Sequence, residues 1–294
     1  MSRFLRAAVA LLLSAAAGAP PAAAIQLPQL EDKDLPPSLV WDAFRYGRNR
    51  RDRIERVVNP IEGRPPVVVT LYSHEDFTHT GRYDEDWLDH YFFDHKLLPM
   101  KLHLDGGGHR NGAEHFAAVA AGIGEIVRRA PRLGYDADRI VLVGSGWGAQ
   151  VAALLATDPA WLEAQGVPLS SIRAVLILDG FGLDLEAELQ SVDSRERKEI
   201  GRMLDGEAAA RFSPLRHASA PNAARFLFYT LPDAPKAAVR TEALASALRS
   251  AGTQAEVKRV ARTRSDVWPS YPGHPRHPEK DALARFLREA VSRP

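Results

Sequence analysis

The chain has 294 residues, of which 38 are basic and 37 acidic, so its formal net charge at pH 7 is +1. A balance this even does not provide the basic surface that attracts nucleic acids or anionic membranes, and neither is expected as a partner. The chain has no cysteine, which excludes a thiol nucleophile and a cysteine-ligated metal, and it is long enough to bury a core without disulfides.

The N-terminus has the pattern of a secretory signal peptide over residues 1–24. Arg3 and Arg6 precede a short apolar run, and an alanine-rich cleavage site follows at 22–24. The run is far shorter than the roughly 20 residues of a membrane-spanning helix. We therefore expect export to a periplasm or the exterior, with no membrane span; a buried N-terminal helix is the alternative. Residues 25–52 are predicted to be a leader segment before a single domain at 53–294.

The domain is predicted to alternate strands with helices. The run at 67–72 is continuous and β-branched, which is typical of a strand buried on both faces of a parallel sheet. The alternation favours a mostly parallel sheet covered by helices on both faces. The charged, helical excursion at about 183–219 is interpreted as a small cap. Strands are predicted at 53–59, 67–72, 97–104, 139–143, 172–178, 225–230 and 256–260, and helices at 114–129, 147–157, 237–250 and 279–291.

A glycine-rich corner joins the strand at 139–143 to the helix at 147–157. Gly144 and Gly148 stand at the flanking positions of a Gly-x-Ser-x-Gly nucleophile elbow, in which a strained turn presents a catalytic serine. The serine position is occupied by Gly146. Because glycine has no hydroxyl to attack a carbonyl, the pattern predicts an elbow without its nucleophile.

The stretch 135–180 resembles the α/β-hydrolase superfamily, and it looks most similar to small bacterial carboxylesterases of the kynurenine-formamidase type. The resemblance extends over about 65–292 and includes the segments 213–217 and 243–252. It implies an α/β-hydrolase fold, with a mostly parallel central sheet, helices on both faces and a small helical cap. It also implies a serine, an acid and a histidine in that chain order, with an oxyanion turn after an early strand.

Three of the four catalytic parts that the resemblance implies fall on unsuitable residues, and only the acid is kept. The acid falls on Asp233, but the histidine position holds Arg264. The oxyanion turn begins at Ser73 and His74, without the expected glycines; these two residues and Trp147 are expected to line the pocket. Loss of a nucleophile or base lowers kcat on the order of a millionfold. The expected function is that of an exported, cofactor-free protein that lacks serine-esterase activity and acts as a small-molecule-binding or accessory module.

The alternative is an active hydrolase of carboxylic esters or amides with an unorthodox site. Ser145 is one candidate nucleophile, but it would place Val143 and Trp147 where the turn needs small residues. A hydrogen bond at the start of the following helix is its simpler role. The proline-bounded His274 and His277 are candidates for the histidine position.

Two further interpretations concern ligands. In the segment 74–95, His74, His79 and His90 are weak metal candidates for water activation, although their spacing matches no established metal motif. A solvated acidic helix is the simpler interpretation, and no metal is expected. Arg264 beside the vacated apex would suit an anionic ligand, unless it pairs with Asp233 or Asp266.

Overall fold

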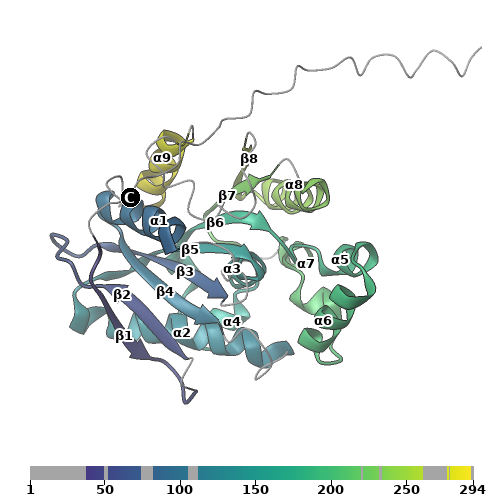
Figure 1. The fold of residues 1–294 in the computed structure, drawn as a ribbon, viewed down its shortest axis with the longest axis horizontal. Helices are drawn as coiled ribbons and strands as arrows, with labels where there is room; N and C mark the ends of the chain where they lie inside the picture. Colours follow the sequence, from purple (N-terminus) through teal and green to yellow (C-terminus); the bar gives the residue numbers. More distant parts are fainter. Residues whose placement is uncertain are drawn as a thin grey trace, which may run out of the picture.

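The structure, a computed structural model, describes residues 38–49, 52–73, 82–104, 112–219, 221–231, 234–260, 277 and 279–292. Its strands form one sheet in the order β1-β2-β4-β3-β5-β6-β7-β8 (Figure 1). The pairings β1–β2 and β2–β4 are antiparallel, and all the others are parallel. The strands are β1 (Trp41–Arg45), β2 (Arg53–Val57), β3 (Pro66–Ser73), β4 (Leu98–Leu104), β5 (Asp136–Gly146), β6 (Ile172–Gly180), β7 (Arg225–Thr230) and β8 (Gln254–Arg259).

Helices cover both faces of this sheet (Figure 1). α1 and α9 lie on one face, and α2, α3 and α8 lie on the other. The remaining helices follow β5 or β6. The helices are α1 (Arg82–Asp94), α2 (Gly112–Leu133), α3 (Trp147–Thr157), α4 (Ala160–Glu163), α5 (Leu185–Ser191), α6 (Ser194–Leu204), α7 (Pro214–His217), α8 (Pro235–Ser250) and α9 (Lys280–Val291), with 3-10 helices η2 (Leu169–Ser171) and η3 (Ala209–Phe212).

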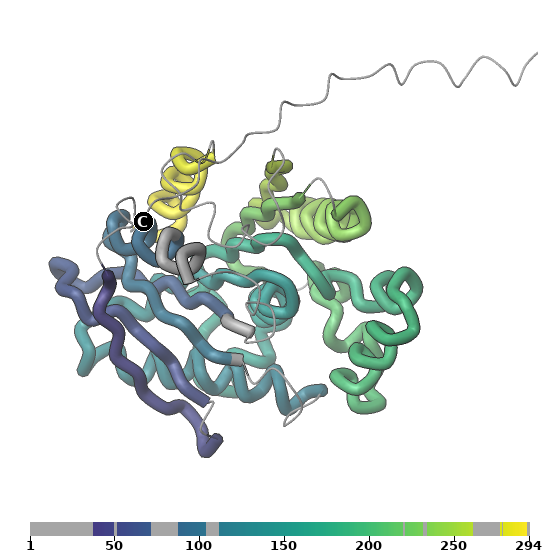
Figure 2. Tube along the Cα trace, in the orientation of Figure 1, coloured from purple at the N-terminus to yellow at the C-terminus, as the bar shows by residue number. Residues whose placement is uncertain are grey.

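The two faces follow from side-chain alternation along the strands. In β5, Ile140 and Leu142 pack in the core beneath α2 and α3, whereas Val141 and Val143 pack in the core beneath α1 and α9. A strand buried on both faces needs an uninterrupted apolar run, which is what made the parallel sheet predictable. The chain enters the sheet at its β1 edge, and its last helix, α9, packs on β5 and β6 (Figure 2).

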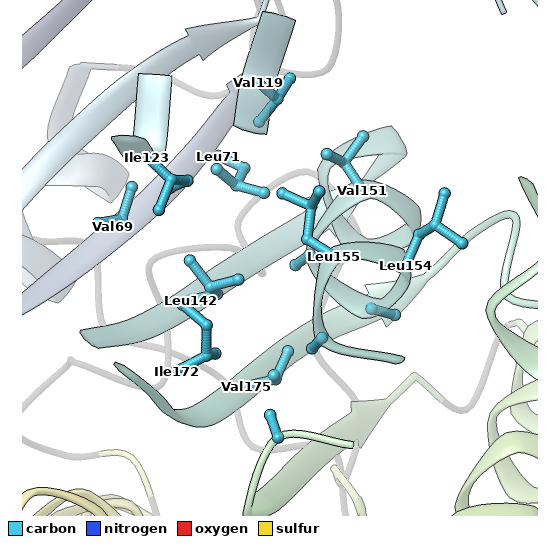
Figure 3. Close-up of a cluster of buried hydrophobic side chains, with 14 of the residues drawn as sticks. Val69, Leu71, Val119, Ile123, Leu142, Val151, Leu154, Leu155, Ile172 and Val175 are labelled. Atoms are coloured by element: carbon cyan, nitrogen blue, oxygen red, sulfur yellow. The ribbon is translucent and has the colours of Figure 1, made fainter. Parts of the chain in front are cut away.

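Helix α3 is almost entirely buried and lies directly on the sheet. Figure 3 shows Val151, Leu154 and Leu155 among strand side chains such as Leu142 and Val175. All residues of α3 from Gly148 to Thr157 are buried, and many are alanines, so the helix backbone comes close to the strands. Full burial of one leucine contributes about 1.5–3 kcal/mol. The N-terminus of α3 is therefore held firmly where β5 ends.

The predicted cap region contains α5, α6, η3 and α7, which follow the carboxyl end of β6 (Figure 1). Aspartates cap the first two helices, as their position in the sequence favours. Asp184 accepts a hydrogen bond from the backbone N–H of Ala187, and Asp193 accepts from those of Arg195 and Glu196. Strand β1, in contrast, lies in the range predicted as a leader and forms the edge of the sheet, with Trp41 opposite Val57.

Within the described ranges, no helix combines the length and the apolar character that crossing a bilayer requires.

Candidate functional site

The turn between β5 and α3 has the backbone geometry of an elbow. Gly146 is the last residue of β5 and also the N-cap of α3, so no linking residue separates strand from helix. Its φ is 52° and its ψ is −124°. This is a positive-φ conformation that glycine adopts freely and that residues with side chains avoid. The strained conformation of a nucleophile elbow is thus present at a residue without a hydroxyl.

Gly144 and Gly148 are required by close backbone contacts around this turn. A Cβ atom on Gly144 would lie 2.2 Å from the carbonyl oxygen of Gly148, and one on Gly148 would lie 2.5 Å from that of Leu71 in β3. Both obstructing atoms belong to the backbone and cannot rotate away. These contacts explain why small residues flank position 146 on both sides, and they make Gly146 the apex of the turn.

Ser145 lies beside the apex but on the strand. It pairs with Leu178 of β6, and by alternation it faces the same side of the sheet as Val141 and Val143. Gly146, the N-cap of α3, has no side chain that could form a capping hydrogen bond. The N-cap position belongs to Gly146, because the strand ends there, and the hydrogen bond expected of Ser145 at the start of the helix stays a prediction.

Two aromatic rings stand next to the apex. Gly146 pairs with Gly180 at the end of β6, and each glycine is followed by an aromatic residue, Trp147 and Phe181. The ring centroids are 4.5 Å apart with an interplanar angle of 65°, an edge-to-face contact. Both residues are partly exposed. Together they form an aromatic wall. Phe181 was not predicted, although the repeated strand–glycine–aromatic pattern was a signal for it.

The segment after β6 is tightly folded against α3 and the cap. Asp179 and Gly182 both have positive φ, of 59° and 69°. A Cβ atom on Gly182 would lie 3.0 Å from the buried side chain of Gln150 in α3. The Gln150 amide in turn donates to the carbonyl oxygen of Phe212 in η3, at 2.8 Å. The elbow helix is thereby connected to the cap.

Several predicted site residues lie outside the described residues: His74, His79, Asp233, Arg264 and His274, together with the side chain of Ser73. Their roles remain predictions. His277 is described, and it lies between β8 and α9. Its ring is buried edge-on against Tyr229, and its Nδ1 accepts a hydrogen bond from the backbone N–H of Glu279 at 3.0 Å. In the neutral ring the proton is therefore on Nε2.

The metal interpretation has no support among the residues that the structure covers. They contain no group of three or more histidine and carboxylate side chains arranged to hold an ion. His90 is a buried residue of α1, and the neighbouring Asp89 pairs with Lys101, with 2.8 Å between Oδ2 and Nζ. A carboxylate neutralised by an ammonium group is a poor metal ligand.

Comparison with known proteins connects this architecture to esterases. No family model matches the sequence, and no curated protein matches it. Among solved structures, inhibited esterase B from Lactobacillus rhamnosis is similar with a TM-score of 0.68 at 13% identity, over 87% of both chains. Thermogutta terrifontis esterase 2, phosphoramylated by tabun, has a TM-score of 0.60 at 17% identity, over 88% of this chain and 96% of the other.

An esterase from the fungus Rhizomucor miehei is also similar, with a TM-score of 0.62 at 13% identity, over 86% of this chain and 84% of the other. These likenesses, together with the mostly parallel eight-stranded sheet, confirm the predicted fold: the chain has an α/β-hydrolase fold.

Proposed function

We propose that this chain is an exported α/β-hydrolase-fold protein that binds a small molecule and does not act as a serine esterase. The observation that carries the proposal is the conformation of Gly146. The elbow backbone is kept at φ 52° and ψ −124°, and the residue on it has no nucleophilic atom. The aromatic wall of Trp147 and Phe181 remains beside the apex, where an apolar ligand would make contact.

The size of the catalytic loss supports this proposal. In a serine hydrolase the hydroxyl forms the covalent bond and an imidazole activates it. Without the nucleophile, kcat falls on the order of a millionfold, and the remaining rate depends on the oxyanion donors and on binding. The predicted Arg264 at the histidine position and the predicted turn at Ser73 and His74 remove the other contributors.

The purified mature chain is expected to hydrolyse p-nitrophenyl butyrate no faster than a Gly146→Ala variant. It is also expected to gain no mass with a fluorophosphonate, a reagent of the organophosphorus class that modified the Thermogutta terrifontis esterase 2 structure. Release of p-nitrophenol and intact-protein mass spectrometry are the measurements. Saturable turnover together with one phosphonyl group per chain would contradict the proposal.

The alternative is an active hydrolase of carboxylic esters or amides, in line with the resemblance to kynurenine-formamidase-type carboxylesterases. Ser145 is a partly exposed residue one position from the apex, and this observation keeps the alternative open. Under our proposal, Ser145→Ala and removal of metals with EDTA both leave p-nitrophenyl butyrate hydrolysis within about twofold of the untreated wild type. A hundredfold loss in Ser145→Ala identifies an unorthodox nucleophile. A loss with EDTA that zinc reverses identifies a metal-activated water.

A further inference from the structure

The carboxyl end of β6 carries a β-bulge opposite the elbow apex. Ser145 of β5 pairs with Leu178 of β6, but the next residue of β5, Gly146, pairs with Gly180. Asp179 is therefore an extra residue inserted between two regular pairs. Bulges are rare between parallel strands, and they are over-represented next to active sites, where they change the direction of a side chain. This bulge places Asp179 beside the pair that contains the apex.

Asp179 also has a strained backbone conformation for its residue type, with a φ of 59°. Two other non-glycine residues of the described ranges have positive φ, Lys96 and Asp205. Both lie just after a helix, where left-handed residues commonly end helices. Asp179, in contrast, lies within a strand. Glycine would adopt this conformation without strain, so an aspartate there indicates that its side chain has a use.

Strands β5 and β6 are buried until they reach this place. Every residue of 140–144 in β5 and of 174–178 in β6 is buried. Both strands become accessible at the same end, where the partly exposed residues are Ser145, Gly146, Trp147, Asp179 and Phe181. Ligands of mostly parallel α/β sheets bind at the carboxyl ends of the strands. The bulge thus brings a carboxylate to the end of β5 and β6 that a ligand can reach.

Two aromatic rings and one carboxylate flank the paired glycines. Trp147 follows Gly146, Phe181 follows Gly180, and Asp179 directly precedes Gly180. An aromatic face attracts a cation through its quadrupole, most strongly in tryptophan, and a carboxylate attracts a cation through its charge. An uncharged ligand gains nothing from the carboxylate, and an anion is repelled by it. The combination favours a ligand with a positive charge on an apolar body.

We infer that Asp179 and the aromatic wall together select an organic cation, an ammonium group carried on an apolar body. The inference rests on the proposed function and states which class of small molecule the site takes. A carboxylate has about four acceptor positions, so Asp179 can contact a ligand and keep its contacts within the protein. The expectation of an anionic ligand depended on Arg264, which lies outside the described residues. The two expectations predict opposite charge preferences.

The test compares three ligands of nearly equal size: benzylammonium, benzyl alcohol and benzoate, which are cationic, neutral and anionic at pH 7. Their dissociation constants for the full mature chain are measured by saturation-transfer NMR titration at low ionic strength. We expect benzylammonium to bind about tenfold more tightly than benzyl alcohol, and benzoate to bind more weakly than either. Trp147→Ala should weaken the binding of all three ligands, because it removes half of the aromatic wall.

Asp179→Asn removes the charge and keeps the backbone, because asparagine tolerates the left-handed region better than most residues with side chains. The preference for benzylammonium over benzyl alcohol is expected to fall from about tenfold to within about twofold. Asp184→Asn is the matched control. It removes one charge from the same segment, and asparagine caps helix α5 as well as aspartate does. This control should keep the wild-type preference.

Asp179→Gly separates ligand selection from a merely structural role. Glycine adopts φ 59° without strain, so we expect this variant to unfold at no lower temperature than the wild type and still to lose the preference for the cation. Lower unfolding temperatures in Asp179→Gly and Asp179→Asn, together with an unchanged preference, identify a structural residue and overturn the inference.

Two results with the wild type alone would also overturn it: benzoate binding at least as tightly as benzylammonium, or no binding of any of the three ligands. Both can be obtained even if the variants do not fold. Tighter binding of benzoate would point to a cation at the apex, such as the predicted Arg264. Hydrolysis of p-nitrophenyl butyrate is measured separately, and turnover by the wild type would remove the proposed function while leaving the charge preference intact.

Discussion

Gly144→Ala is expected to lower the free energy of unfolding by about 3 kcal/mol or more, a large effect for the addition of one methyl group. The added Cβ would lie 2.2 Å from the carbonyl oxygen of Gly148, which belongs to the buried first turn of α3. Strand and helix would have to separate, and the core under α3 would lose contacts. Thermal unfolding followed by circular dichroism should show a midpoint lower by roughly 6–12 °C.

The matched control for this prediction is Gly201→Ala in the exposed face of α6. There, no described atom lies within 4 Å of the added Cβ. In the interior of an exposed helix, alanine is more stable than glycine by about 0.8–1 kcal/mol, so the control should be slightly stabilised. Equal stability of Gly144→Ala and the wild type would mean that the elbow is not packed as described.

The second large expected effect is a gain in catalysis. It is expected when Gly146→Ser is combined with Arg264→His, and not for Gly146→Ser alone. The single variant should lose about 1–3 kcal/mol, because serine must adopt φ 52°. It should hydrolyse p-nitrophenyl butyrate within tenfold of the wild-type rate, since an arginine cannot accept the serine proton. The double variant, which supplies a base, is expected to exceed the single variant on the order of a hundredfold.

Gly146→Ala separates the effect of backbone strain from the effect of the added hydroxyl, because alanine is strained in the same way but has no hydroxyl. A thousandfold gain in Gly146→Ser alone would show that a histidine such as His274 or His277 already reaches the apex. The protein would then lack only the nucleophile of the catalytic machinery, and not the base. Initial rates and fluorophosphonate labelling of all four proteins give the answer.

The parts of the fold that the sequence predicts are those with an unambiguous apolar pattern. The runs at 67–72 and 225–230 became β3 and β7, and the glycine pattern at 144–148 became the turn into α3. A strand buried on both faces requires a long apolar run, and a tight turn requires glycine. Both features are therefore visible in a short stretch of sequence. The sequence likewise predicts the absence of a nucleophile at the apex.

The missed elements are those whose stability comes from partners far away in the chain. The aspartate-rich sequence of helix α1 predicts a solvated acidic helix, whereas in the structure Leu88 and Phe92 pack it on the sheet and Asp89 pairs with Lys101 of β4. Strand β1 is an edge strand with half-exposed residues and no continuous apolar run. The pairing of Glu188 with Arg240 spans two helices and has no local signal at all.

The backbone contacts around Gly144 and Gly148 have a consequence for how activity and stability are balanced in this fold. The turn is imposed by packing between β3, β5 and α3, so its shape does not depend on the residue at its apex. A serine there serves the reaction and strains the chain, whereas a glycine adopts φ 52° without that strain. Once selection for hydrolysis ends, exchange of serine for glycine at this position removes activity and improves stability in one step, which is the reverse of the usual destabilising mutation.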